Sequence, residues 1–129
     1  MYLIDGYNLL YQFYKNIDGN KISYYREEII FLIKDYCETK KKKAQIFFDV
    51  KNVPLVSLLP IRFKSDYLKV SYVKDADLAI INILENTKDI TRYTVISSDR
   101  KISSYAQKKG FKVLSSQKFK TILLTFKME

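Results

Sequence analysis

The chain has 129 residues, 47% of them apolar, a length and composition that suit a single domain, residues 1–129, with a buried core. Its formal net charge of +9 favours polyanionic partners such as nucleic acid, although a lysine-rich genome would produce the same excess. The absence of histidine excludes a Ser-His-Asp triad and a Cys/His zinc site, and no apolar stretch is long enough to span a membrane.

The first third of the chain predicts one strand followed by two helices. Residues 2–4 are a short strand candidate, and Asp5-Gly6-Tyr7-Asn8 has the composition of a turn before a helix over about 8–14. Residues 16–20 indicate a loop. The clearest helix follows, because its apolar residues share one face at 3.6-residue spacing: Ile22, Tyr25, Ile29, Leu32, Ile33 and Tyr36.

The single cysteine, Cys37, continues this helical pattern and cannot form an internal disulfide. It is expected to be a reduced, packed residue of a cytoplasmic protein. Residues 40–43 then form a charged turn that leads into a strand over 44–48.

The remainder of the chain alternates strands and helices. Residues 51–66 contain Pro54 and Pro60 and indicate a long loop. Two strand–helix pairs follow, 68–73 with 75–87 and 93–97 with 99–109, and Gly110 takes the C′ position of the second helix. Residues 111–114 are a last strand, and residues 117–127 fit either a helix or a closing strand. This alternation predicts an α/β fold with a mainly parallel sheet.

Acidic residues follow four of the strand candidates. They are Asp5, Asp49, the pair Asp75 and Asp77, and Asp99. If the strands are parallel, these carboxylates gather at the carboxyl edge of one sheet, which is where open α/β sheets bind ligands.

Each acid also has a purely structural interpretation. Asp75 and Asp99 precede predicted helices and could cap them, and Asp77 would complement a helix dipole in the first turn. Asp5 could shape a turn. Asp49 has no predicted helix after it to cap. Taken together, these local roles do not explain why acids end four separate runs at one predicted edge.

Carboxylates packed together raise one another's pKa unless a cation compensates their charge. Mg²⁺ and Mn²⁺ are hard cations that prefer oxygen ligands. One such ion can generate hydroxide from bound water, and two can clamp the attacking and leaving oxygens of a phosphodiester. The pattern therefore indicates a metal-dependent nuclease that needs no histidine.

The string Asp5-Gly6-Tyr7-Asn8-Leu9-Leu10 resembles the opening motif of NYN domains, specifically the YacP-like branch of the PIN-like nuclease superfamily. The resemblance continues in order along nearly the whole chain, through Phe47-Phe48-Asp49, Asp75-Ala76-Asp77, Ser97-Ser98-Asp99, Gly110-Phe111-Lys112-Val113 and Ser115-Ser116 with Phe119. It implies a PIN-like three-layer sandwich with strand order 3-2-1-4-5. It also implies metal-dependent endoribonuclease activity on single-stranded RNA.

Position by position, the resemblance implies functional roles for seven residues. The metal-binding acids would be Asp5, Asp49, Asp77 and Asp99. Asn8 and Ser98 would be further catalytic residues, and Asp75 would be an outer-shell partner of the metal or a helix cap. Messenger RNA and the ribosome are the partners that the family implies, and we expect a cytoplasmic monomer or weak dimer.

Basic and aromatic residues beside the acids are candidate RNA contacts. The candidates for phosphate are Lys51, Lys74, Arg100 and Lys101, with Lys15 and Arg62 as further ones. Tyr7 could stack on an unpaired base, and so could Tyr11 or Tyr14. Ordinary surface charge and core packing are the alternatives for these residues.

The lysine run 40–43 precedes the strand that ends at Asp49, so we expect it at the opposite end of the sheet. It is interpreted as a solvated turn, with a distant RNA or ribosome contact as the alternative.

Two rival functions stay open. A non-catalytic RNA-binding or ribosome-binding module would keep the fold, although it has no need for repelling carboxylates in its cleft. A phosphoacceptor receiver domain would also place acids at strand ends, but it usually has paired acids after the first strand and a lysine after the fifth. Here Gly6 follows Asp5, and Ser115 follows Leu114.

Overall fold

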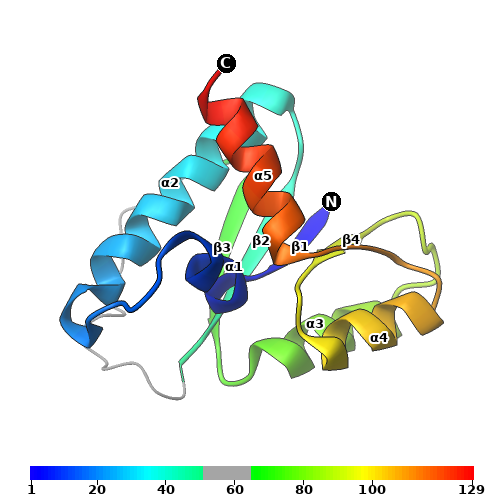
Figure 1. The fold of residues 1–129 in the computed structure, drawn as a ribbon. Coiled ribbons are helices and arrows are strands. Elements are labelled where there is room, and N and C mark those ends of the chain that lie inside the picture. The colour runs from blue at the N-terminus through cyan, green and yellow to red at the C-terminus, as the bar shows by residue number, and fades with distance from the viewer. Residues whose placement is uncertain (51–64) are drawn as a thin grey trace.

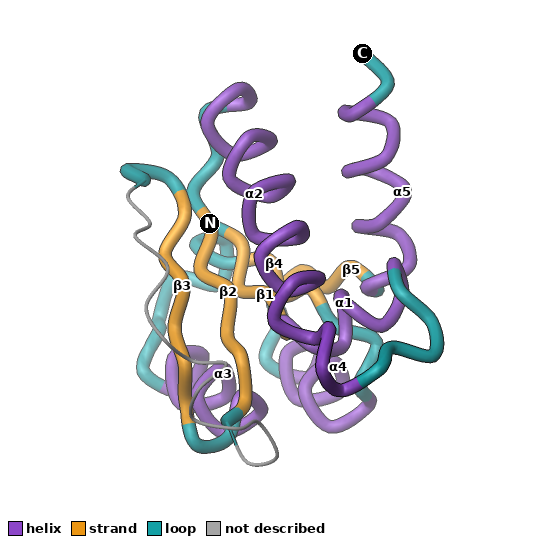
Figure 2. The backbone as a smooth tube through the Cα atoms, turned by 90° about the vertical axis from the view of Figure 1, so that its left-hand side faces the viewer, coloured by secondary structure: helices purple, strands orange, loops and turns teal. Residues whose placement is uncertain are grey.

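The computed structural model describes residues 1–50 and 65–129 of the chain. Within these residues, one fully parallel sheet forms the centre, with its strands in the order β3-β2-β1-β4-β5 (Figure 2). The strands are β1 (Tyr2–Asp5), β2 (Ala44–Asp49), β3 (Leu68–Val73), β4 (Thr94–Ile96) and β5 (Lys112–Leu114). The predicted α/β fold and strand order are therefore confirmed. Most of the expected loop 51–66 lies outside the described residues.

Helices cover both faces of this sheet (Figure 1). The helices are α1 (Gly6–Phe13), α2 (Ile22–Lys40), α3 (Ala76–Glu85), α4 (Arg100–Lys108) and α5 (Ser116–Lys127), with a 3-10 turn, η1 (Gly19–Lys21), before α2. Helices α1, α2 and α5 share one apolar core with the sheet, and α3 and α4 share another. The three-layer sandwich is confirmed.

Strand alternation decides which layer each side chain faces. Leu3 and Phe47 belong to the core under α3 and α4, whereas Ile4 and Phe48 belong to the core under α1, α2 and α5. Side chains two residues apart in a strand point to the same face. Asp5, two residues after Leu3, therefore lies on the α3–α4 side of the sheet.

The C-terminal segment, which fitted either a helix or a strand, is helix α5. Phe119 and Leu123 are fully buried at helical spacing. Phe119 packs against the rings of Tyr2 and Tyr36 at 5.4 and 6.0 Å between centroids. The Ser115 hydroxyl accepts a hydrogen bond from the Lys118 backbone N–H at 3.1 Å and caps the helix.

Helix α1 begins at Gly6, two residues before the predicted start, so the expectation of a turn over 5–8 was wrong. The chain passes directly from strand β1 into the helix, which lies against β2. A Cβ at position 6 would meet the Phe47 carbonyl oxygen at 2.5 Å and the Phe48 ring at 2.6 Å. Only glycine permits so close an approach.

Two smaller predictions are confirmed. Gly110 follows the C-cap of α4 with a φ of +92°, the left-handed conformation expected at C′. The lysine run lies at the amino edge of the sheet, away from the acids, because the Lys43 carbonyl oxygen accepts the Tyr2 backbone N–H at 2.9 Å. No helix in the described part of the chain is long and apolar enough to cross a membrane.

Candidate active site

Asp5 ends strand β1 and is only 8% exposed. The Ser97 hydroxyl donates a hydrogen bond to its Oδ2 at 3.1 Å. Burial raises the pKa of Asp5 to about 6, and repulsion from Asp77 and Asp99 contributes to this shift, while the Ser97 hydrogen bond opposes it. A buried carboxylate with like charges around it is the most perturbed acid at this edge of the sheet.

Ser97 joins Asp5 to the start of helix α4. Its Oγ donates to Asp5 and also accepts the backbone N–H of Asp99 at 3.0 Å. The sequence motif singled out Ser98 and not Ser97. Strand alternation could have identified it, because Ser97 comes two residues after Val95, which faces the α3–α4 layer.

Asp77 and Asp99 stand at the N-termini of α3 and α4. Burial, and next the charge of Asp99, raises the pKa of Asp77; Asp75 and Asp49 add to the effect, and Lys101 opposes it. Asp99 caps α4 by accepting the Lys101 backbone N–H at 2.8 Å. Its capping role and its charge at the site therefore coexist.

Asp49 ends strand β2, half-buried and farther out than Asp5. In the parallel register Asp5 pairs with Phe47, so Asp49 lies two residues, or roughly 7 Å, beyond that level. It is nevertheless close enough to contribute to the raised pKa of Asp77.

Asp75 caps helix α3. Its Oδ1 accepts the Leu78 backbone N–H at 3.1 Å. This is one of the two roles expected for Asp75, and an outer-shell role stays a prediction.

Asn8 holds together three elements at this edge. Its Oδ1 accepts the backbone N–H of Ser98 at 2.9 Å and the hydroxyl of Ser116. The Ser98 hydroxyl in turn accepts the Ser116 backbone N–H at 3.0 Å. The arrangement ties helix α1 to the start of α5 and to the loop between β4 and α4. The hydroxyl of Ser98 therefore contacts Ser116, and it is the Ser97 hydroxyl that contacts Asp5.

The basic residues that are candidate RNA contacts differ in how the structure describes them. Lys74, Arg100 and Lys101 are exposed, and Lys101 is close enough to lower the pKa of Asp77. Lys51 and Arg62 lie outside the described residues.

Tyr7 is half-buried, and its ring packs edge-on against Phe48 at 5.0 Å between centroids. Its hydroxyl accepts a hydrogen bond from Arg26 Nη1 at 3.1 Å. Packing thus fixes the Tyr7 ring, whereas the neighbouring residue Tyr11 is 48% exposed.

Arg26 supports this edge and was not predicted from the sequence. It is 1% exposed, and its Nη2 donates to the Ser23 hydroxyl at 3.2 Å. Its guanidinium lies 5.5 Å from the centre of the Tyr72 ring. A signal was available, because position 26 falls between Ile22 and Ile29 on the apolar face of the helix, where a charged residue is unusual.

The side chains at this edge offer carboxylate and other oxygens, which are the ligand atoms that a hard divalent cation prefers. Asp5, Asp77 and Asp99 repel one another, and a bound cation would relieve this repulsion. Within the described residues, however, no three acidic or cysteine side chains form a group that could hold a metal ion as they stand. Ligation by several of these acids would require their side chains to rotate toward a common point.

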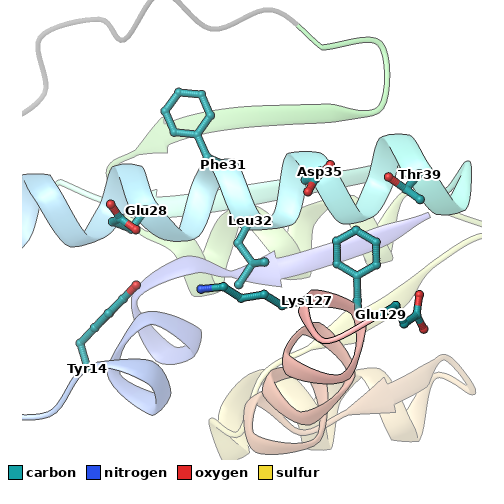
Figure 3. A pocket seen from close by; sticks show the side chains of 9 residues that line it. Tyr14, Glu28, Phe31, Leu32, Asp35, Thr39, Lys127 and Glu129 are labelled. Atoms are coloured by element: carbon teal, nitrogen blue, oxygen red, sulfur yellow. The ribbon is translucent and has the colours of Figure 1, made fainter.

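A separate groove of about 520 Å³ lies between α2 and α5 (Figure 3). Three carboxylates line it, Glu28, Asp35 and Glu129, together with Phe31 and Lys127 among others. None of the four predicted metal-binding acids is part of this groove.

The sequence and the fold of the chain both match known proteins. The sequence model of the YacP-like NYN domain matches residues 2–129. The crystal structure of Rae1 (YacP) from Bacillus subtilis superposes with a TM-score of 0.79 and 19% identity, covering 99% of this chain and 75% of that one. A point mutant of the same protein gives 0.75 and 19%, covering 98% and 76%. At this identity the likeness shows the fold. No match was found among curated proteins.

Proposed function

The chain belongs to the YacP-like NYN domain family, and on that premise we propose that it is a metal-dependent endoribonuclease that hydrolyses phosphodiester bonds of single-stranded RNA. The family supports a nuclease-like function that acts on RNA. The metal dependence and the preference for single-stranded RNA go beyond the family match, and we propose them in addition. Messenger RNA on the ribosome, and hence a cytoplasmic activity, are added on the family resemblance alone.

One observation carries the proposal. The carboxylate of Asp5 is buried at the carboxyl edge, and Ser97 joins it by hydrogen bonds to the start of α4, where Asp99 lies. Asp77 approaches closely enough for its charge to act on Asp5. A fold gains no stability from burying one carboxylate near two others, so this arrangement favours a functional role for the charge.

In this proposal the acids at the carboxyl edge bind the metal ion. Asp5, Asp77 and Asp99, with Asp49 farther out, would hold Mg²⁺ or Mn²⁺. When bound, the ion supplies positive charge to the phosphodiester and lowers the pKa of a water molecule. The Ser97 hydroxyl and the Asn8 backbone N–H hold the carboxylate of Asp5 in place.

The remaining residues act on the RNA and on the shape of the site. The exposed cations Lys74, Arg100 and Lys101 would bind phosphates on either side of the acids and offset their repulsion of the RNA. Asn8 is a positioning residue, because its side chain holds the loop that carries Ser98 and its backbone N–H hydrogen-bonds to Asp5.

Cleavage of a labelled single-stranded RNA tests the proposal. Wild type should cleave it with Mn²⁺ or Mg²⁺ and stop in EDTA. Asp5→Asn and Asp77→Asn should each slow cleavage by about 100-fold or more, because each removes a charge that holds the ion. Asp35→Asn, an exposed acid on α2, is the matched control and should cleave like wild type. Equal cleavage by wild type and both site variants would reveal a contaminating nuclease and reject the assignment.

A non-catalytic RNA-binding or ribosome-binding module is the second candidate. It is favoured by one observation, that the described acids do not form a ready metal-binding group. Binding of RNA by wild type with no cleavage at saturating Mn²⁺, on naked RNA and on ribosome-bound RNA alike, would establish this candidate instead.

A further inference from the structure

A basic hollow of about 630 Å³ lies at the amino edge of the sheet, at the opposite end of the strands from the acids. We call it the amino-edge hollow. Five cationic side chains line it, together with Met1, Tyr2, Thr94 and Leu114; the cations are Lys41, Lys42, Lys43, Arg92 and Lys112.

The sheet brings these cations together from three distant segments. The lysines at 41–43 form the turn between α2 and β2, and the Lys43 carbonyl oxygen accepts the Tyr2 backbone N–H at 2.9 Å. Arg92 precedes β4, and the Thr94 backbone N–H donates to the Met1 carbonyl oxygen at 2.9 Å. Lys112 begins β5 and pairs in register with Thr94. The hollow is therefore a product of the fold as well as of the lysine run in the sequence.

The positive charge of the amino-edge hollow is only partly offset by a nearby acid: hydrogen bonds from Thr91 lower the pKa of Asp89, and the charge of Arg92 adds to this effect. Among the described residues, no carboxylate lines the hollow itself, and none forms a salt bridge with any of its five cations. Three of the cations lie over aromatic rings instead: Lys42 over Tyr2, Lys41 over Tyr67 and Arg92 over Tyr93. The groove between α2 and α5, in contrast, is lined by three carboxylates. A concave surface lined by one sign of charge concentrates counter-ions of the other sign.

We propose that the amino-edge hollow binds backbone phosphates of RNA, so that the protein holds its RNA at a place remote from the acidic edge. This inference rests on RNA as the substrate in the proposed function. Several cations spread over a wide hollow suit a row of phosphates, and Arg92 can bind one of them with two parallel hydrogen bonds.

Distance separates this contact from the chemistry. Strand β2 has six residues, which at ~3.3 Å each places the two edges roughly 20 Å apart. The amino-edge hollow therefore binds RNA that flanks the reacting bond and does not take part in cleaving it. A flat anionic membrane fits a concave surface poorly, which favours a nucleic acid over a lipid surface.

Two charge-matched triple variants test the proposal. Lys42→Gln, Lys43→Gln and Lys112→Gln together remove three exposed cations from the amino-edge hollow. Lys88→Gln, Lys108→Gln and Lys127→Gln together remove three exposed lysines that do not line it. Fluorescence anisotropy measures the Kd of each for a single-stranded RNA in EDTA, over a series of salt concentrations.

We expect the hollow triple to bind RNA about tenfold more weakly than wild type at 0.1 M salt. Its slope of log K against log salt should be shallower by about 2, since each lost phosphate contact removes ~0.7. The control triple should stay near wild type. Equal weakening in both triples, or none in the hollow triple, overturns the proposal. So does a hollow triple that loses binding to phosphatidylserine vesicles while keeping its RNA affinity.

The assay is independent of cleavage, because EDTA removes divalent ions. Weak RNA binding by the hollow triple alone, without any cleavage by wild type, would support the amino-edge hollow and reject the nuclease. Metal-dependent cleavage with equal RNA binding by both triples would support the nuclease and reject the hollow.

Discussion

At the scale of single residues, the hydrogen bond between Ser97 and Asp5 and the raised pKa of Asp5 are the main features of the carboxyl edge. Hydrogen bonds from the Ser97 hydroxyl and the Asn8 backbone stabilise the ionised form of Asp5. Burial, together with the charges of Asp77 and Asp99, outweighs them and leaves the pKa of Asp5 raised. In the absence of a cation, ionised Asp5 therefore destabilises the folded protein.

The replacement Asp5→Asn should raise the stability of the metal-free protein at neutral pH. Because the pKa of Asp5 rises from 3.8 to about 6 on folding, its penalty is absent below about pH 4, grows as the pH rises, and is complete above about pH 6. Above that pH the variant should exceed wild type by on the order of 2 kcal/mol in free energy of unfolding. Urea unfolding in EDTA at several pH values measures the difference.

The control for this comparison is Asp35→Asn, which changes an exposed acid and should show no such pH-dependent gain. If Asp5→Asn is no more stable than wild type above pH 6, or gains equally at pH 4, the buried charge is not the cause.

At the scale of elements, the site depends on how helix α1 begins. The helix starts one residue after Asp5 and carries Asn8, whose side chain accepts hydrogen bonds from the Ser98 backbone N–H and the Ser116 hydroxyl. Close contact between Gly6 and strand β2 sets the position of this helix. A displacement of α1 would therefore be transmitted to the loop that carries Ser97 and Asp99.

The replacement Gly6→Ala should destabilise the protein by about 1–3 kcal/mol, because the added methyl group overlaps the Phe47 carbonyl oxygen and the Phe48 ring. RNA cleavage per folded molecule should fall as well. Gly19→Ala is the matched control, since nothing lies within 4 Å of a Cβ at position 19. Urea unfolding of both variants checks the prediction, and equal stabilities would show that α1 does not pack against β2 as described.

At the scale of the whole molecule, the sequence predicted the fold well where strands and helices had strong periodic patterns. The parallel arrangement of the strands predicted that the acids lie at one edge of the sheet. The family resemblance predicted the strand order. The start of α1 was missed because Asp5-Gly6-Tyr7-Asn8 has turn composition, while tertiary packing against β2 decides its conformation. Residues 117–127 were ambiguous until the burial of Phe119 and Leu123 fixed a helix.

The sequence predicted which acids lie at the ends of the strands, but not the contacts between residues at that edge. Asp75 and Asp99 act as caps, as the local pattern suggested, but neither the Ser97 bridge nor the buried Arg26 follows from adjacency in the sequence. Both depend on which face of an element meets the edge of the sheet. Residues separated by about ninety positions, such as Asn8 and Ser98, form contacts that only the folded chain creates.

The molecule as a whole separates its charges between two ends. Asp5 and Asp77, whose pKa values are raised, lie at the carboxyl edge. The described residues that line the amino-edge hollow include five cations and no acid. The proposed function and the proposed RNA contact would both use this separation, because the amino-edge hollow would attract RNA while a bound cation would offset repulsion at the carboxyl edge.

A crystal of the protein soaked in Mn²⁺ tests the central claim most directly, through anomalous scattering of the metal. The account predicts a Mn²⁺ peak at the carboxyl edge, coordinated at about 2.2 Å by carboxylate oxygens of Asp5, Asp77 and Asp99, with Asp49 beside it. Anomalous density only at other sites, or none at a Mn²⁺ concentration that supports RNA cleavage, would contradict it.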